Sequence, residues 1–274
     1  MRPKLIRCKV SLSAMLSTEL LTFYRQMAQR DLTIVDLETT GFKPPVARAI
    51  EISIIKANLE DGIQQQVTHL INPGVRVPEH ITRITGISQA MVASADQSTE
   101  IWPACLPLLE TGIFTAHNAA FDYPFVKAEL KLQGQTFHKP SHEQFCTVIF
   151  SRLMLPDLPS RSLPNLVEHF GFEVGRSHRA GADTMACWLL AKMLLTEVCE
   201  TNDAELLQRF GKQWLPMQEV TKIFGCKQAI AQRKLHLAGL EPRISGRSKT
   251  LMYQRAEVER VFWETQGRQT SLLE

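Results

Sequence analysis

The sequence predicts a mixed α/β domain followed by a smaller helical domain, and three features support this prediction. Short apolar segments rich in β-branched residues alternate with amphipathic segments of helical period through residues 29–199. A length of 274 residues exceeds that of one ordinary domain. Positive charge concentrates late in the chain, because residues 222–255 hold eight Lys and Arg against the single acid Glu241.

The composition argues against several classes of protein. Hydrophobic residues make up 44% of the chain and charged residues 22%, which is ordinary for a globular protein. The longest apolar stretch, residues 185–195, is interrupted by Lys192 and is shorter than the roughly 20 residues of a membrane helix. Six scattered cysteines without a CxxC pair predict free thiols in a reducing cytoplasm, of bacterial or phage type.

The expected elements of the first domain follow from apolar periodicity. Strands are expected at residues 32–37, 50–58, 67–71 and 112–116. The Asp61-Gly62 turn predicts that the second and third of these strands form a hairpin. Helices are expected up to Met27 and at residues 98–109, 119–132, 146–153, 162–170 and 180–198, while 78–87 is expected to be irregular. This order predicts a mixed sheet with helices on its faces.

The remaining segments complete the expected domain organisation. Residues 1–28 are expected to form an N-terminal helical extension rather than a signal peptide, because polar residues break the apolar stretch. The polar stretch 200–213 is the expected boundary. A small domain at 214–264 is expected to contain helices at 217–224, 227–237 and 255–262, with a basic stretch between the last two, and 265–274 is an expected flexible tail.

Four acids and a histidine stand at the ends of expected strands and helices. Asp36 and Glu38 are two residues apart on a strand, so their side chains point to one face. Asp122 and Asp183 each fall in the first turn of a helix, and His178 precedes Asp183 by five residues. Each feature alone is common, since strand-end acids are usually solvated and an Asp at a helix start complements the helix dipole.

Taken together and in this order, three motifs resemble those of the DEDDh family of DnaQ-like 3′–5′ exonucleases, which includes polymerase III epsilon-like proteins. The motifs are D-x-E-T-T-G at 36–41, H-N-x-x-F-D at 117–122 and H-R-A-x-x-D at 178–183. The resemblance covers roughly residues 30–198 and implies an RNase H-like fold with a five-stranded mixed sheet. It implies that His178 is the general base and that the metal-binding acids are Asp36, Glu38, Asp122 and Asp183.

Three positions refine the resemblance. Arg179 occupies the place where the sister subclass has Tyr, which favours the histidine subclass. Gly181 stands where the family often has Leu, and this glycine is expected to loosen the start of its helix. Cys146 stands where an Asp is common. Neither of the last two is expected to contact a ligand.

The chemistry of the substrate explains this set of residues. A phosphodiester gains negative charge as water attacks, and two cations about 3.5–4 Å apart can stabilise the entering and leaving oxygens. Carboxylates are the preferred ligands of Mg²⁺ or Mn²⁺, so two such cations are the expected cofactors. Histidine side chains have an unperturbed pKa of about 6.5, which suits a base that removes a proton from water at neutral pH.

The resemblance also implies substrate contacts around the acids, from Thr39, Thr40, Gly41, Phe42, Ile84, His117 and Asn118. Gly41 lacks a Cβ and so permits close approach to the terminal nucleotide. Phe42 and Ile84 are candidates to flank the terminal base, but each could equally be a core residue. Asn118 could contact substrate or cap the following helix.

The small domain resembles the winged helix-turn-helix of MerR-like and excisionase-like proteins, on the positions 219–225, 239–240 and Tyr253. This resemblance implies a recognition helix and a wing against phosphates, formed by Gln228, Gln232, Arg233, Arg247 and Lys249. The alternative is a solvated basic face. The tail at 269–273 resembles peptides that dock bacterial replication proteins on the sliding clamp, which implies a clamp or a polymerase as partner.

These features predict a 3′–5′ exonuclease that releases nucleoside 5′-monophosphates from single-stranded 3′ ends of DNA, in proofreading or repair. An RNA-trimming exoribonuclease of the same family stays open, because the metal chemistry does not sense the 2′-hydroxyl. A DNA-binding regulator or replication accessory protein is the third hypothesis. The convergence of four acids and a histidine argues against it, because packing alone does not require that set.

Overall fold

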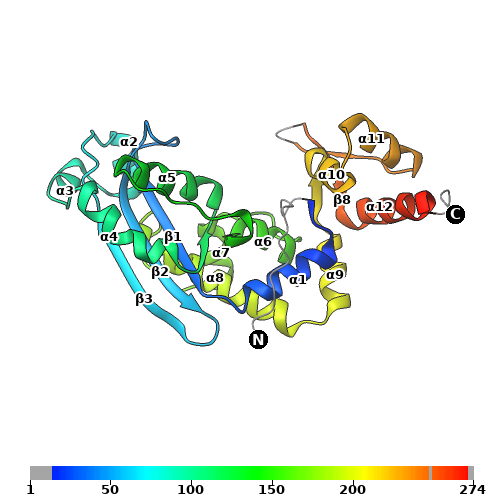
Figure 1. Ribbon diagram of the computed structural model, residues 1–274, viewed down its shortest axis with the longest axis horizontal. Coiled ribbons are helices and arrows are strands. Elements are labelled where there is room, and N and C mark those ends of the chain that lie inside the picture. The colour runs from blue at the N-terminus through cyan, green and yellow to red at the C-terminus, as the bar shows by residue number, and fades with distance from the viewer. Residues whose placement is uncertain (1–13, 247–248, 271–274) are drawn as a thin grey trace. The chain divides into compact units, whose positions relative to one another are not determined.

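The computed structural model describes residues 14–246 and 249–270, with side chains as far as residue 266 (Figure 1). These residues fall into two compact units. The sheet unit comprises Gln26–Ser151 and Leu158–Glu197. The terminal unit comprises Arg152–Asp157 and the described parts of Met1–Arg25 and Val198–Glu274. Each unit contains a hydrophobic core of its own.

The sheet unit is built on a five-stranded mixed sheet in the order β3-β2-β1-β4-β5. The antiparallel pairs are β1 with β2 and β2 with β3, and the parallel pairs are β1 with β4 and β4 with β5. The strands are β1 (Leu32–Thr39), β2 (Ala49–Asn58), β3 (Gly62–Leu70), β4 (Ile113–Ala116) and β5 (Gln144–Cys146). The α/β class and the mixed five-stranded sheet expected from the sequence are confirmed.

Helices flank this sheet, and α4 and α5 cover one of its faces (Figure 1). Leu37 of β1 packs there in a buried cluster with Trp102 and Phe125. Because side chains alternate along a strand, Asp36 and Glu38 point to the opposite face. The helical segments are α2 (Glu79–Thr85), α3 (Gln89–Ala93), α4 (Ser98–Glu110), α5 (Ala119–Leu132), η2 (Ser141–Glu143), α6 (Thr147–Met154), α7 (Leu163–Phe170) and α8 (Ala180–Glu200).

The start of α8 lies on the face that carries Asp36. Ser53 pairs with Asp36 across β2 and β1, and Thr68 Oγ1 of β3 donates to Ser53 Oγ at 3.0 Å. A Cβ at position 181 would lie 3.3 Å from Thr68 Oγ1. Gly181 therefore allows the first turn of α8 to lie close against the sheet, a packing role that the sequence-based expectation of a loosened helix start did not include.

Two elements differ from the sequence-based expectation. Residues 78–87, expected to be irregular, contain α2, which buries Ile81 and Thr85 and ends at Gly86 in the left-handed conformation. Packing of Ile81 with Ile50 and Ile87 stabilises this short helix despite its β-branched residues. Strand β5 was not located from the sequence, because three residues are too few to show an alternating pattern.

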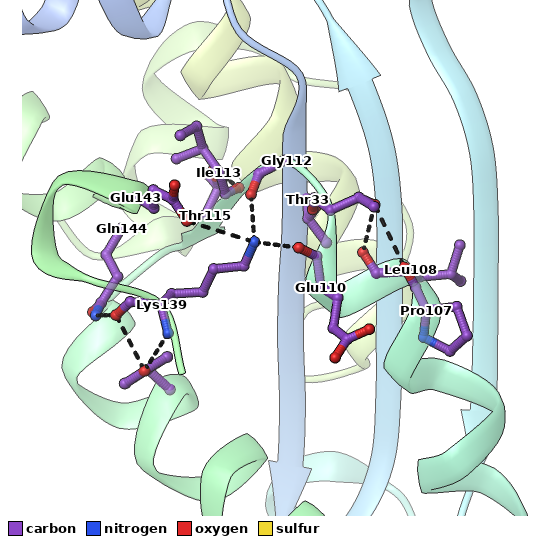
Figure 2. A network of polar contacts seen from close by, with 12 residues as sticks. Thr33, Pro107, Leu108, Glu110, Gly112, Ile113, Thr115, Lys139, Glu143 and Gln144 are labelled. Atoms are coloured by element: carbon purple, nitrogen blue, oxygen red, sulfur yellow. Dashed lines mark hydrogen bonds and ion pairs between the residues drawn. The ribbon is translucent and has the colours of Figure 1, made fainter. Parts of the chain in front are cut away.

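Two lysines cap the C-terminal end of α4. Lys139 Nζ donates to the carbonyls of Glu110 at 2.6 Å and Gly112 at 2.9 Å (Figure 2). Lys56 Nζ donates to the carbonyl of Thr111 at 3.0 Å and to Thr33 Oγ1 at 2.7 Å. Burial lowers the pKa of both lysines. The last carbonyls of a helix lack partners within the helix, so these ammonium groups fix α4 where it leads into β4.

The terminal unit contains a three-stranded antiparallel sheet in the order β6-β8-β7. Its core includes Leu215, Val220, Leu235, Tyr253 and Val258. The elements are α1 (Ser17–Met27), α9 (Asp203–Gly211), β6 (Trp214–Pro216), α10 (Met217–Phe224), α11 (Gln228–Leu237), β7 (Arg243–Ile244), β8 (Leu251–Gln254) and α12 (Arg255–Thr270). The last two residues of α1 belong to the sheet unit. Among the helices of the described residues, none is both long and apolar enough to cross a membrane.

Two segments of this unit are more ordered than the sequence suggested. The polar stretch 200–213 forms α9, in which Asn202 caps the helix by accepting from the Glu205 N–H at 3.0 Å, and Leu206 and Phe210 are buried. Those two residues are four apart and share one helix face, which is the periodicity that a boundary assignment overlooked. Helix α12 continues past residue 262 as far as Thr270.

The N-terminal helix α1 is held to residues near the other end of the chain. Ser17 donates from its backbone N–H and from its Oγ to Glu259 Oε1, at 2.8 and 2.9 Å. The buried Arg255 donates to the carbonyl of Met15 at 3.0 Å. Arg25 forms an ion pair of 2.7 Å with Asp203 at the start of α9. The segment 14–25 is therefore an integral part of the terminal unit.

Candidate active site

Asp36 and Glu38 lie near the end of β1, where the strand has no partner on one side. β1 pairs with β4 only from Leu32 to Ile34, so both acids lie beyond that pairing. β4 then ends at Ala116, and the helix that follows brings Asp122 to the acids. The Asp122 carboxyl is 2% exposed and accepts a hydrogen bond from the backbone of Leu37. This hydrogen bond joins the second motif, which carries Asp122, to the first motif, which carries Asp36 and Glu38.

The third motif brings a base and an acid to the same place. Glu38, His178 and Asp183 offer ligand atoms that all lie within 4.8 Å of one another. The backbone N–H of His178 donates to Asp183 Oδ2 at 3.0 Å. His178 has a φ of 60°, in the left-handed region, and its side chain is exposed. The structure therefore brings together the four acids and the histidine that the resemblance implied.

The acids repel one another in the metal-free protein. Burial raises the pKa of Asp36 well above its ordinary value, and Asp122, Asp183, Glu38 and Glu51 raise it further. Burial raises the pKa of Glu38 to about 8, with contributions from Asp183 and Glu51 and an opposing one from Arg179. Burial also raises the pKa of Asp122 and of Asp183.

This donor set fits divalent cations. The converging groups are carboxylates, whose oxygens suit Mg²⁺ and Mn²⁺. Burial and the repulsion of neighbouring carboxylates raise the pKa values of Asp36 and Glu38, and bound cations would favour the charged carboxylates. Among the described residues, Asp36, Glu38, Asp122 and Asp183 are thus the residues suited to hold such ions.

Sequence analysis missed Glu51, which is 1% exposed on β2 and pairs in register with Glu38. Arg179 donates to Glu51 Oε1 from Nη2 at 2.6 Å and from Nε at 3.1 Å. The backbone N–H of Ala180 donates to Glu51 Oε2 at 2.8 Å. The available signal was an acid between two isoleucines in a strand expected to be buried, because a buried charge requires a partner.

A second buried ion pair, also missed, lies beside the loop after β1. Glu129 of α5 is 2% exposed and accepts from Arg48 Nε and Nη2, both at 2.9 Å. The backbone N–H of Ala49 donates to Glu129 Oε1 at 2.9 Å. Arg48 in turn exchanges two hydrogen bonds of 2.9 Å with Thr40, through the Arg48 N–H to Thr40 Oγ1 and the Thr40 N–H to the Arg48 carbonyl.

Most of the other residues expected to contact substrate lie at the end of β1 and in the loop that follows it, and Ile84 lies on α2. Thr39 Oγ1 donates to the carbonyl of Gly41 at 2.6 Å. A Cβ at Gly41 would lie 3.3 Å from the Cβ of Ala47, so the glycine permits the two arms of the loop to approach. Phe42 is 82% exposed and Ile84, on α2, is 48% exposed. These exposures exclude the alternative that either residue belongs to the core.

The two residues that open the second motif have different surroundings. Asn118 is exposed at the start of α5 with a φ of 81°, and its side chain makes no capping hydrogen bond. The His117 ring donates from Nε2 to the carbonyl of Arg161 at 2.9 Å and accepts at Nδ1 from Thr147 Oγ1 at 2.9 Å. Burial lowers the pKa of His117 to about 4. With both ring nitrogens bonded, His117 is suited to position the motif and not to bind substrate through its nitrogens.

The residues expected to bind DNA in the small domain fall on two elements. Gln228 and Arg233 are exposed on α11, and Gln232 is half-buried there. Lys249 is exposed between β7 and β8, with a φ of 51°. Arg247 lies outside the described residues, as do residues 271–273 of the clamp-like tail.

Comparison with known proteins matches residues 33–191 to a family described as Exonuclease. DNA polymerase III PolC-type of Clostridium perfringens is 30% identical over 194 residues, which are 70% of this chain and 13% of that protein. DNA polymerase III subunit epsilon of Aquifex aeolicus is 32% identical over 164 residues, 59% of this chain and 79% of that protein. The solved nuclease domain of 3′hExo, a DEDDh family member bound to rAMP, shares the fold, with a TM-score of 0.52 and 18% identity over 63% of this chain and 94% of that one. The chain thus spans a small part of the first relative and most of the second.

Proposed function

Because the chain belongs to the exonuclease family that its residues 33–191 match, we propose that it is a metal-dependent 3′–5′ exonuclease acting on DNA. The reaction is hydrolysis of the terminal phosphodiester, which releases a nucleoside 5′-monophosphate. The observation that carries the proposal is the convergence of four carboxylates with an exposed histidine at the end of β1. A structural role alone does not explain buried acids that raise one another's pKa.

Asp36, Glu38, Asp122 and Asp183 are the proposed ligands of two Mg²⁺ or Mn²⁺ ions. When bound, the cations supply positive charge that stabilises the entering and leaving oxygens of the phosphodiester. His178 accepts the proton of the attacking water, because its exposed ring stands beside Glu38 and Asp183. The hydrogen bond from the His178 backbone to Asp183 keeps the base next to the acids.

The loop after β1 is the proposed seat of the terminal nucleotide. Thr39, Thr40 and Gly41 form a hydrogen-bonded turn directly after Asp36 and Glu38. The exposed side chains of Phe42 and Ile84 are suited to stack against bases of single-stranded DNA. Asn118 is a further candidate contact, because its exposed side chain is not used as a helix cap.

DNA is favoured over RNA as substrate because the relatives named above are DNA polymerase III proteins. The same names support a polymerase as a partner and proofreading or repair as the process. The nuclease domain bound to rAMP keeps an RNA-trimming activity as the second candidate. Scattered cysteines and bacterial relatives support a reducing bacterial cytoplasm as the location.

The proposed domain organisation follows the boundaries given above, with a winged helix-turn-helix-like DNA-binding domain at 214–264. Its support is the succession of α10, the left-handed Gly225 and α11, followed by the β7–β8 hairpin. Exposed Arg233 and Lys249 would contact phosphates, and Gln228 and Gln232 would face bases. Arg247 and the clamp-docking tail at 269–273 remain proposals from the sequence.

The test of the nuclease is digestion of 3′- and 5′-labelled single-stranded DNA and RNA with Mg²⁺ or Mn²⁺. We expect stepwise shortening from the 3′ end, a loss of kcat of about 10²–10⁴-fold for His178→Ala, and at least as large a loss for Asp36→Ala. Glu60→Ala removes an exposed acid from the β2–β3 turn and serves as the matched control. A wild-type protein that cuts neither substrate would refute the proposal, and the ratio of DNA to RNA cleavage decides between the two substrates.

The test of the small domain is binding of duplex DNA by the full chain carrying Asp36→Ala, which prevents digestion. Arg233→Ala and Lys249→Ala are expected to weaken binding and each to reduce the salt dependence by about one released counterion. Fluorescence anisotropy at several salt concentrations measures both effects. Unchanged affinity and salt dependence in both variants would assign these residues to a solvated basic surface.

A further inference from the structure

We propose that Glu51 and Arg179 form a positioning pair that holds His178 and Asp183 beside Glu38. This inference rests on the proposed nuclease function and adds two residues to it. Neither residue is one of the four acids that face one another at the end of β1. Both act through the backbone of the segment that joins the histidine to helix α8.

Glu51 is fully engaged within the protein. Its Oε1 accepts from Arg179 Nη2 at 2.6 Å and Nε at 3.1 Å, and its Oε2 accepts from the Ala180 N–H at 2.8 Å. With 1% of its surface exposed, it is closed to solvent. Hydrogen bonds from Arg179 and Ala180 satisfy both of its carboxylate oxygens, so Glu51 does not need a cation and is distinct from the proposed ligands.

The pair fixes the two residues that follow the strained residue His178. His178 adopts a left-handed backbone, which a non-glycine residue keeps only where its surroundings determine it. Its own N–H is bonded to Asp183, and the next two residues, Arg179 and Ala180, are bonded to Glu51. The backbone of residues 178–180 is therefore held by a ring of contacts between Glu51 of β2 and the first turn of α8.

The register of the sheet gives this ring its position. Glu51 pairs with Glu38 across β2 and β1, so the residue that holds the start of α8 is the neighbour of a proposed ligand. This explains how Glu38, His178 and Asp183 come within 4.8 Å of one another although the third motif is distant in sequence from the first. The hydrogen bond from His178 to Asp183 lies within the third motif itself, so Glu51 and Arg179 supply the hydrogen bonds that join this segment to β2.

The competing explanation is that the pair only stabilises the fold. The Arg48–Glu129 pair supplies a comparison, because it too combines a buried glutamate, an arginine that donates from Nε and Nη2, and one backbone N–H donor. It differs in holding the loop of Thr40 instead of the segment of His178. A purely structural role predicts similar consequences for both pairs, whereas a positioning role predicts effects on cation binding and on kcat from Glu51 and Arg179 alone.

The experiment uses the full chain and the variants Glu51→Gln, Arg179→Met, their combination, and Arg179→Lys, with Arg48→Lys as matched control. The kcat and KM are measured on single-stranded DNA with Mn²⁺, and the Kd of Mn²⁺ is measured by calorimetry without DNA. Arg179→Lys keeps the charge but loses the fork of donors, so it tests the pair even if Glu51→Gln does not fold. Unfolding by urea confirms that each variant is folded.

We expect kcat to fall and the Kd of Mn²⁺ to rise by about 10–100-fold in the Glu51 and Arg179 variants, with KM changed less than about threefold. The combined variant should lose no more than the worse single one, because the two residues act as a unit. Arg48→Lys should change KM for DNA more than the Kd of Mn²⁺. Folded Glu51 and Arg179 variants with a wild-type Kd and kcat would overturn the inference. A wild-type protein without nuclease activity would instead refute the proposed function, and the Mn²⁺ titration would still test the pair.

Discussion

Two ion pairs of the same design lie in different surroundings of the sheet unit. In each, a buried glutamate accepts hydrogen bonds from Nε and Nη2 of one arginine and another from a backbone N–H. Glu51 contributes to raising the pKa of Asp36, Glu38 and Asp183, whereas Glu129 is not a cause of the shift of any of the four acids. Similar bonding therefore does not give the two glutamates the same role, because Glu51 lies among the charges of the four acids and raises the pKa of three of them, whereas Glu129 does not.

The second difference is the exposure of the arginine. The side chain of Arg48 is 18% exposed and that of Arg179 is 39% exposed. An arginine left without its partner can recover hydration more easily at the second site. The four predictions below test this comparison, in order of decreasing expected effect.

The largest effect is expected for Glu129→Ala. This change leaves the guanidinium of Arg48 poorly hydrated and unpaired, and breaking a buried pair in this way costs about 3–5 kcal/mol of the free energy of unfolding. Urea unfolding of the metal-free protein measures the loss. A loss below about 1 kcal/mol would mean that Arg48 finds water or another partner. The difference in exposure between Arg48 and Arg179 would then not account for any difference in stability between the two pairs.

A smaller loss of about 1–2 kcal/mol is expected for Glu51→Ala in the same metal-free measurement. Arg179 regains water, and removal of Glu51 relieves its repulsion of Glu38 and Asp183. With Mn²⁺ present the difference from wild type should widen, because the variant binds the cation less tightly. Equal losses with and without Mn²⁺ would argue that Glu51 does not influence the cation site.

The third prediction concerns the dependence of stability on pH. Glu38 has a pKa of about 8 in the folded metal-free protein against an ordinary value of 4.5, so its contribution to stability is complete below pH 4.5 and is lost as pH rises through 8. The Tm of the metal-free protein should therefore fall between these pH values, by about 2–4 °C for each kcal/mol lost. Saturating Mn²⁺ should remove the decline, because cation binding favours the deprotonated acids.

The same titration separates the two glutamates. Glu51→Gln should shift the decline to lower pH, because Glu51 is one cause of the raised pKa of Glu38. Glu129→Gln should leave the midpoint in place. Thermal unfolding in a pH series measures both, and a midpoint that moves equally in the two variants would contradict the comparison.

The smallest effect is expected for Thr40→Val, which removes the acceptor of the Arg48 N–H while keeping the shape of the side chain. The loss of one such hydrogen bond costs about 0.5–1.5 kcal/mol of the free energy of unfolding. Because Thr40 belongs to the proposed seat of the terminal nucleotide, KM for DNA should rise by a few-fold while kcat changes little. If kcat fell as much in Thr40→Val as in Arg179→Lys, the loop of Thr40 and the segment of His178 would contribute equally to catalysis. That result would contradict the comparison.

The residues predicted from the sequence were those whose positions are set locally. Asp36 and Glu38 share a face because of strand periodicity, and Asp122 and Asp183 follow from motif spacing at helix starts. The two ion pairs were beyond such reasoning, because their partners are 81 and 128 residues apart in the sequence. The bonds of His117 to Thr147 and Arg161 are also long-range, so the sequence did not indicate them, and the expected substrate contact of His117 stays a prediction.

The hydrogen bond between Ser17 and Glu259 has a consequence for biosynthesis. The two residues are 242 positions apart, and at 5–20 residues per second roughly 12–50 s pass between their appearance at the ribosome. Throughout that interval Ser17 at the start of α1 lacks the carboxylate of α12 that accepts its two hydrogen bonds. The sheet unit is translated in the meantime, so α1 gains this anchor only after the elements of the sheet unit have been synthesised.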